Sequence, residues 1–149
     1  MKTRVTKTLA SNQGIIYVFD NQTCLKKYKD INQQEFSIYE EIPKKINIDI
    51  IKYFEKLNNK HICKILKIFY KDSEITGYLM PYYNEVTPNI LDFDTEYLSR
   101  NFTELYELIL RLSYDGIRVV DLNPNNLILT KDNIIIIDFD KYCYEKDLD

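Results

Sequence analysis

The chain has 149 residues, enough for one domain with its own hydrophobic core and too few for two ordinary domains. Its hydrophobic fraction of 45% excludes an intrinsically disordered chain. The 20 Lys and Arg residues are outnumbered by 23 Asp and Glu, and the net charge of −3 argues against a general nucleic-acid-binding protein, which should be basic.

The cysteines and the single histidine fit no metal-binding or disulfide pattern. Cys24, Cys63 and Cys143 are odd in number and far apart, so we interpret them as small hydrophobic side chains in a reducing compartment. His61 has no partners at the spacing of a zinc site or a catalytic triad, and we interpret it as structural.

The sequence predicts a cytoplasmic protein that does not enter a membrane. No apolar run approaches the roughly 18 residues of a membrane span. The first 13 residues lack the apolar core of a secretory signal. Delivery into a host cell by a specialised secretion system stays open, because such a signal need not be apolar.

Two β-hairpins are predicted in the first part of the chain, from short runs of β-forming residues that flank turn residues. The first pairs residues 14–20 with 23–29 across Asn21-Gln22, and the second pairs residues 64–72 with 75–83 around Ser73-Glu74. These hairpins predict an antiparallel sheet.

Two helices are predicted between the hairpins. The first begins at a capping box formed by Asp30 and Gln33 and stops at Pro43. The second covers residues 49–57 and places four apolar residues on one face, namely Ile50, Ile51, Phe54 and Leu57.

The second half predicts one long helix and a closing hairpin. Residues 86–94 have an irregular pattern, and residues 101–117 predict a helix that stops at Gly116. Its apolar residues at helical spacing are Phe102, Leu105, Leu108, Ile109 and Leu112. Residues 126–140 predict a hairpin that turns at Asp132-Asn133. The whole order predicts an α+β fold.

Three polar residues follow apolar segments near the end of the chain. Asp121 follows two valines, Asn126 comes five residues later, and Asp138 follows four isoleucines. Polar groups delivered in this way are costly unless they bind something. Taken singly, Asp121 and Asn126 also fit an Asx-rich turn around Pro124, and Asp138 fits a carboxylate that ends a strand.

The order of elements and these motifs resemble the protein-kinase-like superfamily over about residues 9–139. "DLNPNN" stands where that family's catalytic loop reads D-L-x-P-x-N, and "DFD" stands where it reads D-F-G. The resemblance implies a single minimal kinase-like domain over residues 1–149. Its N-lobe, about residues 1–84, would hold an antiparallel sheet and an αC-type helix, and residues 85–149 would form a strongly reduced helical C-lobe.

The resemblance implies a role for each of the three polar residues. Asp121 would orient the hydroxyl of the substrate, while Asn126 and Asp138 would bind Mg²⁺ next to the phosphates of ATP. Carboxylate and amide oxygens are ligands that suit Mg²⁺.

The resemblance also implies a lysine clamp for the phosphates. "TCLKKYK" resembles the family's V-A-I-K strand, which makes Lys26 the phosphate-binding lysine. Lys27 is the competitor and would require a register slip of one residue. "QEFSIYEEI" resembles the αC helix, which makes Glu35 the ion-pair partner of Lys26, with Glu40 and Glu41 as alternatives.

An apolar slot for adenine is implied by the same resemblance. Ile16 and Cys24 would form its roof and Ile128 its floor, because Cys24 shares a strand face with Lys26. "LMPYY", with Met80 and Tyr82, would be the hinge. Gly14 is the glycine that remains of the expected phosphate loop.

Several positions depart from the family pattern. Two valines replace the His-Arg before the catalytic Asp, Asn123 replaces a Lys that touches the transferred phosphate, and Asp140 replaces the glycine of D-F-G. We expect no activation segment and no later C-lobe helices, so that apolar surface is left for a protein substrate or a partner to cover.

Two functions therefore compete. The first is a minimal protein kinase, most simply a Ser/Thr kinase, that recognises a folded substrate; small-molecule kinases rank below it because their acceptor pocket uses the missing helices. The second is a pseudokinase that binds a nucleotide or a partner without phosphate transfer. A kinase-shaped fragment that works only in complex with another chain is a third option.

Overall fold

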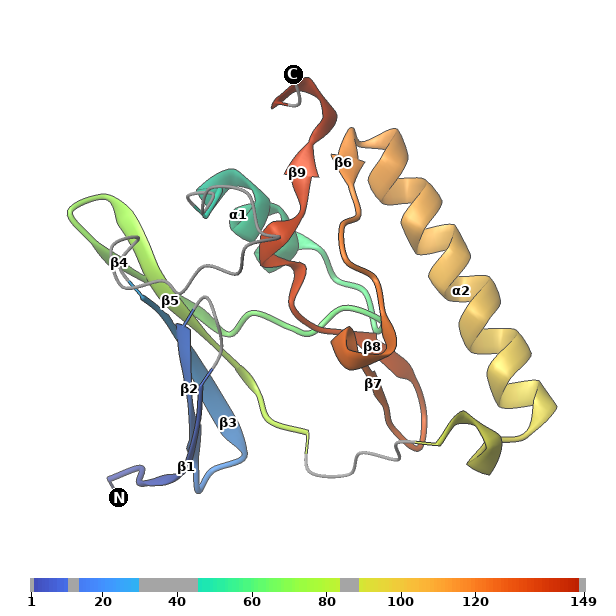
Figure 1. Ribbon diagram of the computed structural model, residues 1–149, viewed down its shortest axis with the longest axis horizontal. Helices are drawn as coiled ribbons and strands as arrows, with labels where there is room; N and C mark the ends of the chain where they lie inside the picture. Colours follow the sequence, from blue (N-terminus) through green and yellow to red (C-terminus); the bar gives the residue numbers. More distant parts are fainter. Residues whose placement is uncertain (1, 11–13, 30–45, 84–88, 148–149) are drawn as a thin grey trace, which may run out of the picture. The chain divides into compact units, whose positions relative to one another are not determined.

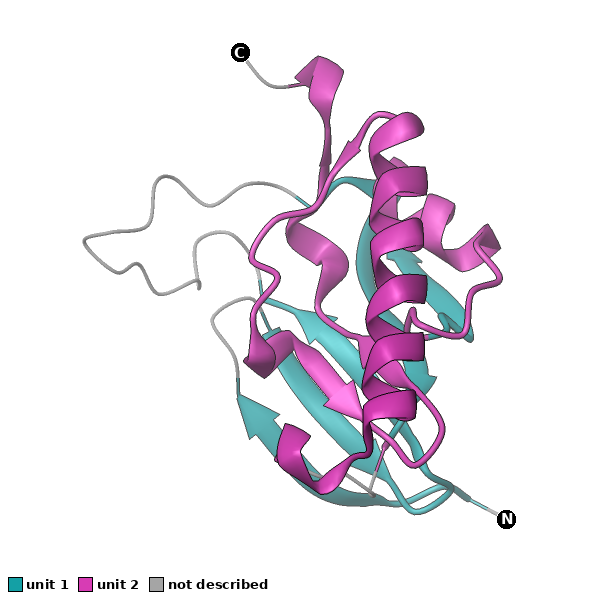
Figure 2. Cartoon of the chain, turned by 90° about the vertical axis from the view of Figure 1, so that its right-hand side faces the viewer, with its two compact units in different colours: residues 1–48, 64–82 teal, residues 49–63, 83–149 magenta. Residues whose placement is uncertain are grey.

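The computed structural model describes residues 2–10, 14–29, 46–83 and 89–147 (Figure 1). These residues form an α+β fold with an antiparallel sheet of five strands and two α-helices. The chain divides into two compact units (Figure 2). Unit 1 comprises Met1–Ile48 and Lys64–Tyr82, and unit 2 comprises Asp49–Cys63 and Tyr83–Asp149.

Unit 1 contains the five-stranded antiparallel sheet, in the order β1-β2-β3-β5-β4. Its strands are β1 (Val5–Ala10), β2 (Gly14–Phe19), β3 (Thr23–Tyr28), β4 (Lys67–Lys71) and β5 (Glu74–Pro81). Both predicted hairpins are confirmed, as β2–β3 and β4–β5. The edge strand β1 was not predicted, because all six of its residues are exposed and give no core-facing alternation.

The turn of the β4–β5 hairpin lies one residue earlier than predicted. Asp72 and Ser73 both have positive φ, of 51° and 67°, and Glu74 already belongs to β5. Positive φ at both central residues is typical of the hairpin turn whose twist matches that of the flanking strands. Asp tolerates this conformation better than most residues, which explains its place at the first position.

Unit 2 is built from short strands and helical segments. The two α-helices are α1 (Ile48–Lys56) and α2 (Thr95–Tyr114). Two small antiparallel sheets pair β6 (Ile117–Arg118) with β9 (Cys143–Tyr144) and β7 (Leu127–Leu129) with β8 (Ile134–Ile136). The 3₁₀ turns are η2 (Ile90–Asp92), η3 (Pro124–Asn126), η4 (Phe139–Lys141) and η5 (Glu145–Asp147). The closing hairpin is confirmed as β7–β8.

The long helix α2 begins earlier than predicted. The Asp94 side chain caps it by accepting a hydrogen bond from the Tyr97 amide at 2.8 Å, so the helix starts at Thr95. It ends where predicted, next to Gly116 with a φ of 78°. Phe102, predicted on the buried face, is 47% exposed. The buried position next to it is the polar Asn101, which apolar periodicity could not reveal.

Asn101 joins α2 to the closing hairpin. Its Nδ2 donates to the Tyr97 carbonyl at 2.9 Å, and its Oδ1 accepts from the Ile134 amide at 2.9 Å. The side chain is fully buried, and both of its polar ends are satisfied. This contact places β8 against α2.

The core of unit 2 forms where α1 packs on the end of the chain. Phe54 lies with its ring centroid 4.4 Å from that of Phe139 and 5.7 Å from that of Tyr142, and all three side chains are buried. The segment after α1 adds to β8, because the Ile136 amide donates to the His61 carbonyl at 2.7 Å and the Cys63 amide to the Ile136 carbonyl at 3.0 Å. Residues 49–63 thus belong to unit 2.

The contacts of His61 agree with its structural interpretation. The buried ring bonds the Ile134 carbonyl through Nδ1 at 2.8 Å and the Glu104 carboxylate through Nε2 at 2.6 Å. Both ring nitrogens are therefore used to join residue 61 to β8 and α2.

The predicted helix over residues 30–43 lies outside the described residues. In the part of the chain that is described, no helix combines the length and the apolar character needed to cross a bilayer.

Candidate functional site

Lys26 lies on the buried face of the unit 1 sheet. Its side chain is 2% exposed, whereas the neighbouring Lys27 is exposed and lies on the opposite face. The Lys26 Nζ lies 5.9 Å from the centroid of the Tyr28 ring, a cation–π contact that compensates part of the cost of burying the ammonium group. Of the two competing lysines, Lys26 is thus the buried one, and its ammonium group contacts an aromatic ring.

The strand register brings other predicted residues onto the same face. Ile16 lies directly opposite Lys26 across β2–β3, and Cys24 lies directly opposite Met80 across β3–β5. Because directly opposed residues of an antiparallel pair share a face, these four side chains form one surface. Cys24 and Met80 are buried, and Ile16 is half-buried. The surface is apolar apart from the Lys26 ammonium group.

The Cys24 side chain is uncharged and behaves as an apolar residue of this surface. Burial raises the pKa of its thiol to about 11, so the group stays protonated at neutral pH. Its Sγ donates to the Pro81 carbonyl at 3.8 Å. Cys24, Cys63 and Cys143 are all free thiols, and the first two are buried, as the sequence predicted.

Two predicted nucleotide-binding residues have roles in the sheet itself. Gly14 pairs with Tyr28, and a Cβ atom at this position would lie 2.2 Å from the Lys27 carbonyl oxygen, so close packing of the strands requires glycine here. The Tyr82 amide donates to the Gln22 carbonyl at 2.9 Å. The Tyr82 amide is thus already used in a hydrogen bond within unit 1.

In unit 2, Asp121 and Asn126 lie together. The Asn126 Nδ2 donates to the Asp121 carbonyl oxygen at 2.7 Å and lies 3.4 Å from its Oδ2. Because the amide nitrogen faces Asp121, the Asn126 Oδ1 points away from it and offers a neutral oxygen ligand.

Asn123 was interpreted only as a replaced lysine, but it holds this loop together. Its Nδ2 donates to the Asp121 Oδ1 at 2.8 Å, and its Oδ1 accepts from the Asn125 amide at 2.9 Å, which caps η3. One side chain thus fixes both the Asp121 carboxylate and the turn that carries Asn126. The D-x-N-P spacing, typical of an Asx turn, was the signal that could have revealed this role.

The residue just before Asp138 is hydrogen-bonded to the same loop. The Ile137 amide donates to the Asn126 carbonyl at 2.9 Å, so the backbone enters Asp138 beside Asn126. Ile128, predicted as the adenine floor, lies opposite Ile135 in the β7–β8 pair and is half-buried. The structure therefore brings Asp121, Asn126 and Asp138 to the open end of the β7–β8 hairpin, and Ile128 lies within its strand β7.

Both carboxylates occupy left-handed backbone conformations. Among the described residues, five residues other than glycine have positive φ, and three of them, Gln22, Asp72 and Ser73, belong to hairpin turns. The other two are Asp121, with φ of 60°, and Asp138, with φ of 58° and ψ of 48°. This conformation costs about 1 kcal/mol or more for an L-residue, and such strain gathers at functional sites. Here no hairpin turn accounts for it.

The residues after Asp138 anchor it to the core. Phe139 is fully buried against Phe54, and Asp140, where the kinase pattern has glycine, is also buried. Tyr142 is buried too; its pKa is raised to about 12 by burial and by the nearby negative charge of Asp121. Tyr142 therefore stays protonated at neutral pH.

Two of the predicted site residues have side chains that suit Mg²⁺. Across the described ranges no three His, Cys, Asp or Glu side chains converge on a metal position. Mg²⁺ in nucleotide sites is typically bound by one or two protein oxygens together with phosphate oxygens and waters. The Asp138 carboxylate and the Asn126 Oδ1 have that chemistry. Glu35, the predicted partner of Lys26, lies outside the described residues.

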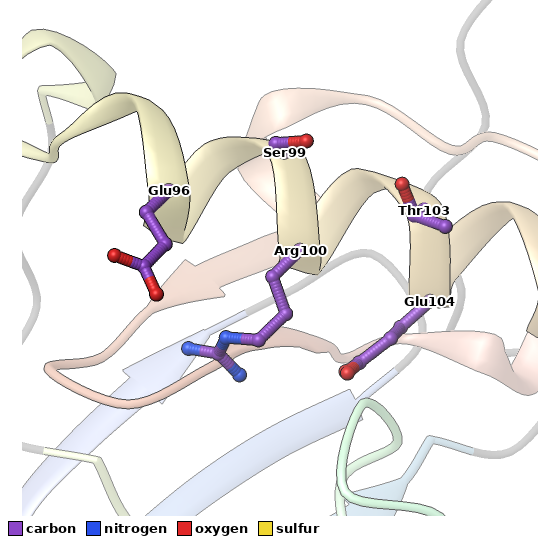
Figure 3. Close-up of a pocket in the computed structure, with 5 residues that line it drawn as sticks. All are labelled: Glu96, Ser99, Arg100, Thr103 and Glu104. Carbon is purple, nitrogen blue, oxygen red and sulfur yellow. The ribbon is translucent and has the colours of Figure 1, made fainter.

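A separate groove of about 330 Å³ lies along α2 (Figure 3). It is open to solvent and contains none of the predicted site residues. Its lining consists of Glu96, Ser99, Arg100, Thr103 and Glu104.

Comparison with known proteins gives no family assignment. No protein-family model matches the chain, and no curated protein matches it significantly.

Proposed function

We propose that the protein is a minimal kinase-like phosphotransferase that uses ATP and Mg²⁺ to phosphorylate a hydroxyl group, most simply of Ser or Thr, on a folded protein. The observation that carries the proposal is the Asp121–Asn123–Asn126 cluster, joined to Asp138 through the backbone. A strained carboxylate held by amide groups suits a group that must be aimed at a reacting hydroxyl.

Asp121 is the residue proposed to orient the attacking hydroxyl. Asn123 donates to one of its carboxylate oxygens at 2.8 Å, which leaves the carboxylate able to accept from a substrate. Phosphoryl transfer needs this positioning because the reaction itself asks for little covalent chemistry from the protein.

Asn126 and Asp138 are the residues proposed to bind the metal. The ion, when bound with ATP, would neutralise charge on the phosphates. The β7–β8 hairpin delivers both residues to the same end, and the Ile137–Asn126 backbone hydrogen bond fixes their spacing.

Lys26 is the residue proposed to bind the phosphates from unit 1. Its face also presents Ile16, Cys24 and Met80, which suit an adenine ring through their apolar surface. Glu35 stays the predicted ion-pair partner of Lys26.

The test is transfer of labelled γ-phosphate from ATP to proteins of a cell lysate in the presence of Mg²⁺. We expect transfer by the wild type and a loss of at least about a hundredfold in Asp121→Asn and Asp138→Asn, as for removal of a positioned catalytic group. Asp132→Asn is the matched control, because this residue is exposed and its hydrogen bond with Arg100 uses its backbone carbonyl. Equal transfer by all variants would contradict the assignment.

The second candidate is a pseudokinase, favoured by Asp140. A buried carboxylate replaces the flexible glycine directly after Asp138-Phe139. Nucleotide binding separates the candidates, since a ligand that binds the folded state raises the melting temperature. A shift with ATP and Mg²⁺ that Asp138→Asn abolishes, without any label transfer, would identify the binding module.

A further inference from the structure

Helix α2 carries a second apolar stripe on its exposed side. The stripe consists of Phe102, Tyr106, Leu110 and Tyr114, with exposed fractions of 47%, 63%, 51% and 92%. A spacing of four residues places them along one side of the helix over about 18 Å. A helix face that meets only water is expected to be polar. A contiguous apolar stripe of this length marks an interaction surface.

The charges of the exposed side lie on one flank of this stripe. Successive helical residues are turned by about 100°, which places four charged residues along that flank, namely Glu96, Arg100, Glu107 and Arg111. The remaining exposed positions beside the stripe carry small uncharged side chains, namely Thr95, Ser99, Thr103 and Ser113. The surface therefore has an apolar centre and a charged border.

The groove on α2 is lined by residues of the N-terminal half of the helix, from Glu96 to Glu104 (Figure 3). Arg100 forms part of its wall and is held in place, because its Nη2 donates to the Asp132 carbonyl at 2.8 Å. The largest exposed side chains, Tyr106 and Tyr114, lie in the C-terminal half. One helix thus carries projecting side chains in one half and a groove in the other.

We propose that this surface binds a second copy of the chain, with the two α2 helices packed antiparallel around a twofold axis near residues 103–104. In this register Phe102 of one copy lies opposite Tyr106 of the other, and Leu98 lies opposite Leu110. Each pair is equidistant from the axis, as an isologous interface requires. Tyr106 of one copy then faces the groove of the other.

The charged flank selects this register. In an antiparallel twofold pair, each flank meets the same flank of the other copy. Arg100 then lies opposite Glu107, and Glu96 lies opposite Arg111, so that opposite charges meet on both sides of the axis. A shift by one helical turn would bring Arg100 opposite Arg111 and Glu104 opposite Glu107. Such like-charge contacts disfavour the alternative register.

A second copy explains these features better than an unrelated partner does. An unrelated helix would have to match the stripe and the border separately, whereas the antiparallel pair matches both at once with one symmetry operation. The proposal does not depend on phosphotransfer, because it uses no residue of the candidate site.

The first test measures the mass of the full chain by light scattering after gel filtration, over a hundredfold range of concentration. We expect a dimer that dissociates on dilution, as mass action requires. Tyr106→Glu should give a monomer, since it places charges of equal sign close to the axis. Tyr70→Glu, at an exposed tyrosine of unit 1, is the matched control and should leave the dimer intact. A monomeric wild type at the highest concentration would overturn the proposal, and circular dichroism checks that each variant is folded.

The second test uses charge reversal to examine the register. Arg100→Glu and Glu107→Arg should each weaken the dimer at least tenfold, because the cross-axis pair between positions 100 and 107 becomes repulsive. An equimolar mixture of the two variants should restore the dimer, since in the mixed pair each introduced charge faces an opposite charge on the other copy. Two intact single-variant dimers, or a mixture that stays monomeric, would overturn the pairing.

Discussion

The two regions that carry the predicted site residues obey different structural rules. Lys26 lies in a regular strand, where side-chain alternation and cross-strand register determine its face. Asp121 and Asp138 lie in irregular backbone with positive φ, where hydrogen bonds from Asn123 and from the Ile137 amide determine the geometry. The regular alternation of the strand thus determines where Lys26 lies, whereas individual polar contacts determine where Asp121 and Asp138 lie.

The largest expected effect comes from a substitution in the hydrophobic core that supports the loop. Phe54→Ala removes a buried ring that packs against Phe139 directly after Asp138. We expect the free energy of unfolding to fall by about 3–5 kcal/mol, as for other buried Phe to Ala changes. Urea denaturation measures this loss. Tyr70→Ala, at an exposed ring of β4, should change stability by no more than about 0.5 kcal/mol, and a similar loss in both variants would refute the described packing.

The two lysines of β3 test the regular half. Lys26→Met should lower phosphate transfer by at least about a hundredfold, or about 2.7 kcal/mol of transition-state stabilisation. Lys27→Met should retain the wild-type rate, because Lys27 lies on the exposed face. Initial rates of label transfer measure both effects. The reverse pattern would support a register shifted by one residue.

Asn123 tests the irregular half. Asn123→Ala should lower kcat by about tenfold while the KM for ATP stays unchanged, because the Asp121 carboxylate loses its donor. Asn123→Asp separates the two contacts of this side chain, since it can still cap the Asn125 amide but cannot donate to Asp121. If Asn123→Asp kept the wild-type kcat, the role of Asn123 would be limited to capping η3. Asn125→Ala serves as the neighbouring control.

The smallest expected effect concerns alkaline pH. Burial and the 2.6 Å hydrogen bond to Asp115 raise the pKa of Tyr53 to about 12, above its ordinary value of 10.0. The folded state therefore retains this proton longer than the unfolded chain, and the stabilisation present below pH 10 is lost as the pH rises to about 12. Tyr53→Phe should show a shallower decline in melting temperature over this interval. An identical decline in both proteins would contradict the contact.

The regular parts of the fold were predictable from local patterns. Alternation and turn residues predicted three hairpins, and Gly116 predicted the end of α2. The placement of Cys24 and Lys26 on one face followed from the same alternation. These features depend on neighbours in sequence, so one sequence suffices to infer them.

The remaining features depend on contacts between distant residues. The exposed strand β1 gains its partner only in the sheet, and the two-residue pair β6–β9 is too short to show any period. Asn101 is buried because Ile134 lies opposite it, although its polarity predicts exposure. Asn123 was interpreted as a lost lysine because its contact with Asp121 is visible only in three dimensions.

Strand β8 has hydrogen-bond partners along both edges, β7 on one side and residues 61–63 on the other. Its amide hydrogens should therefore exchange with solvent only when this part of unit 2 unfolds as a whole. The backbone that leads to Asp138 consequently continues from a strand that is held on both edges. Slow deuterium uptake at Ile136 would be its signature.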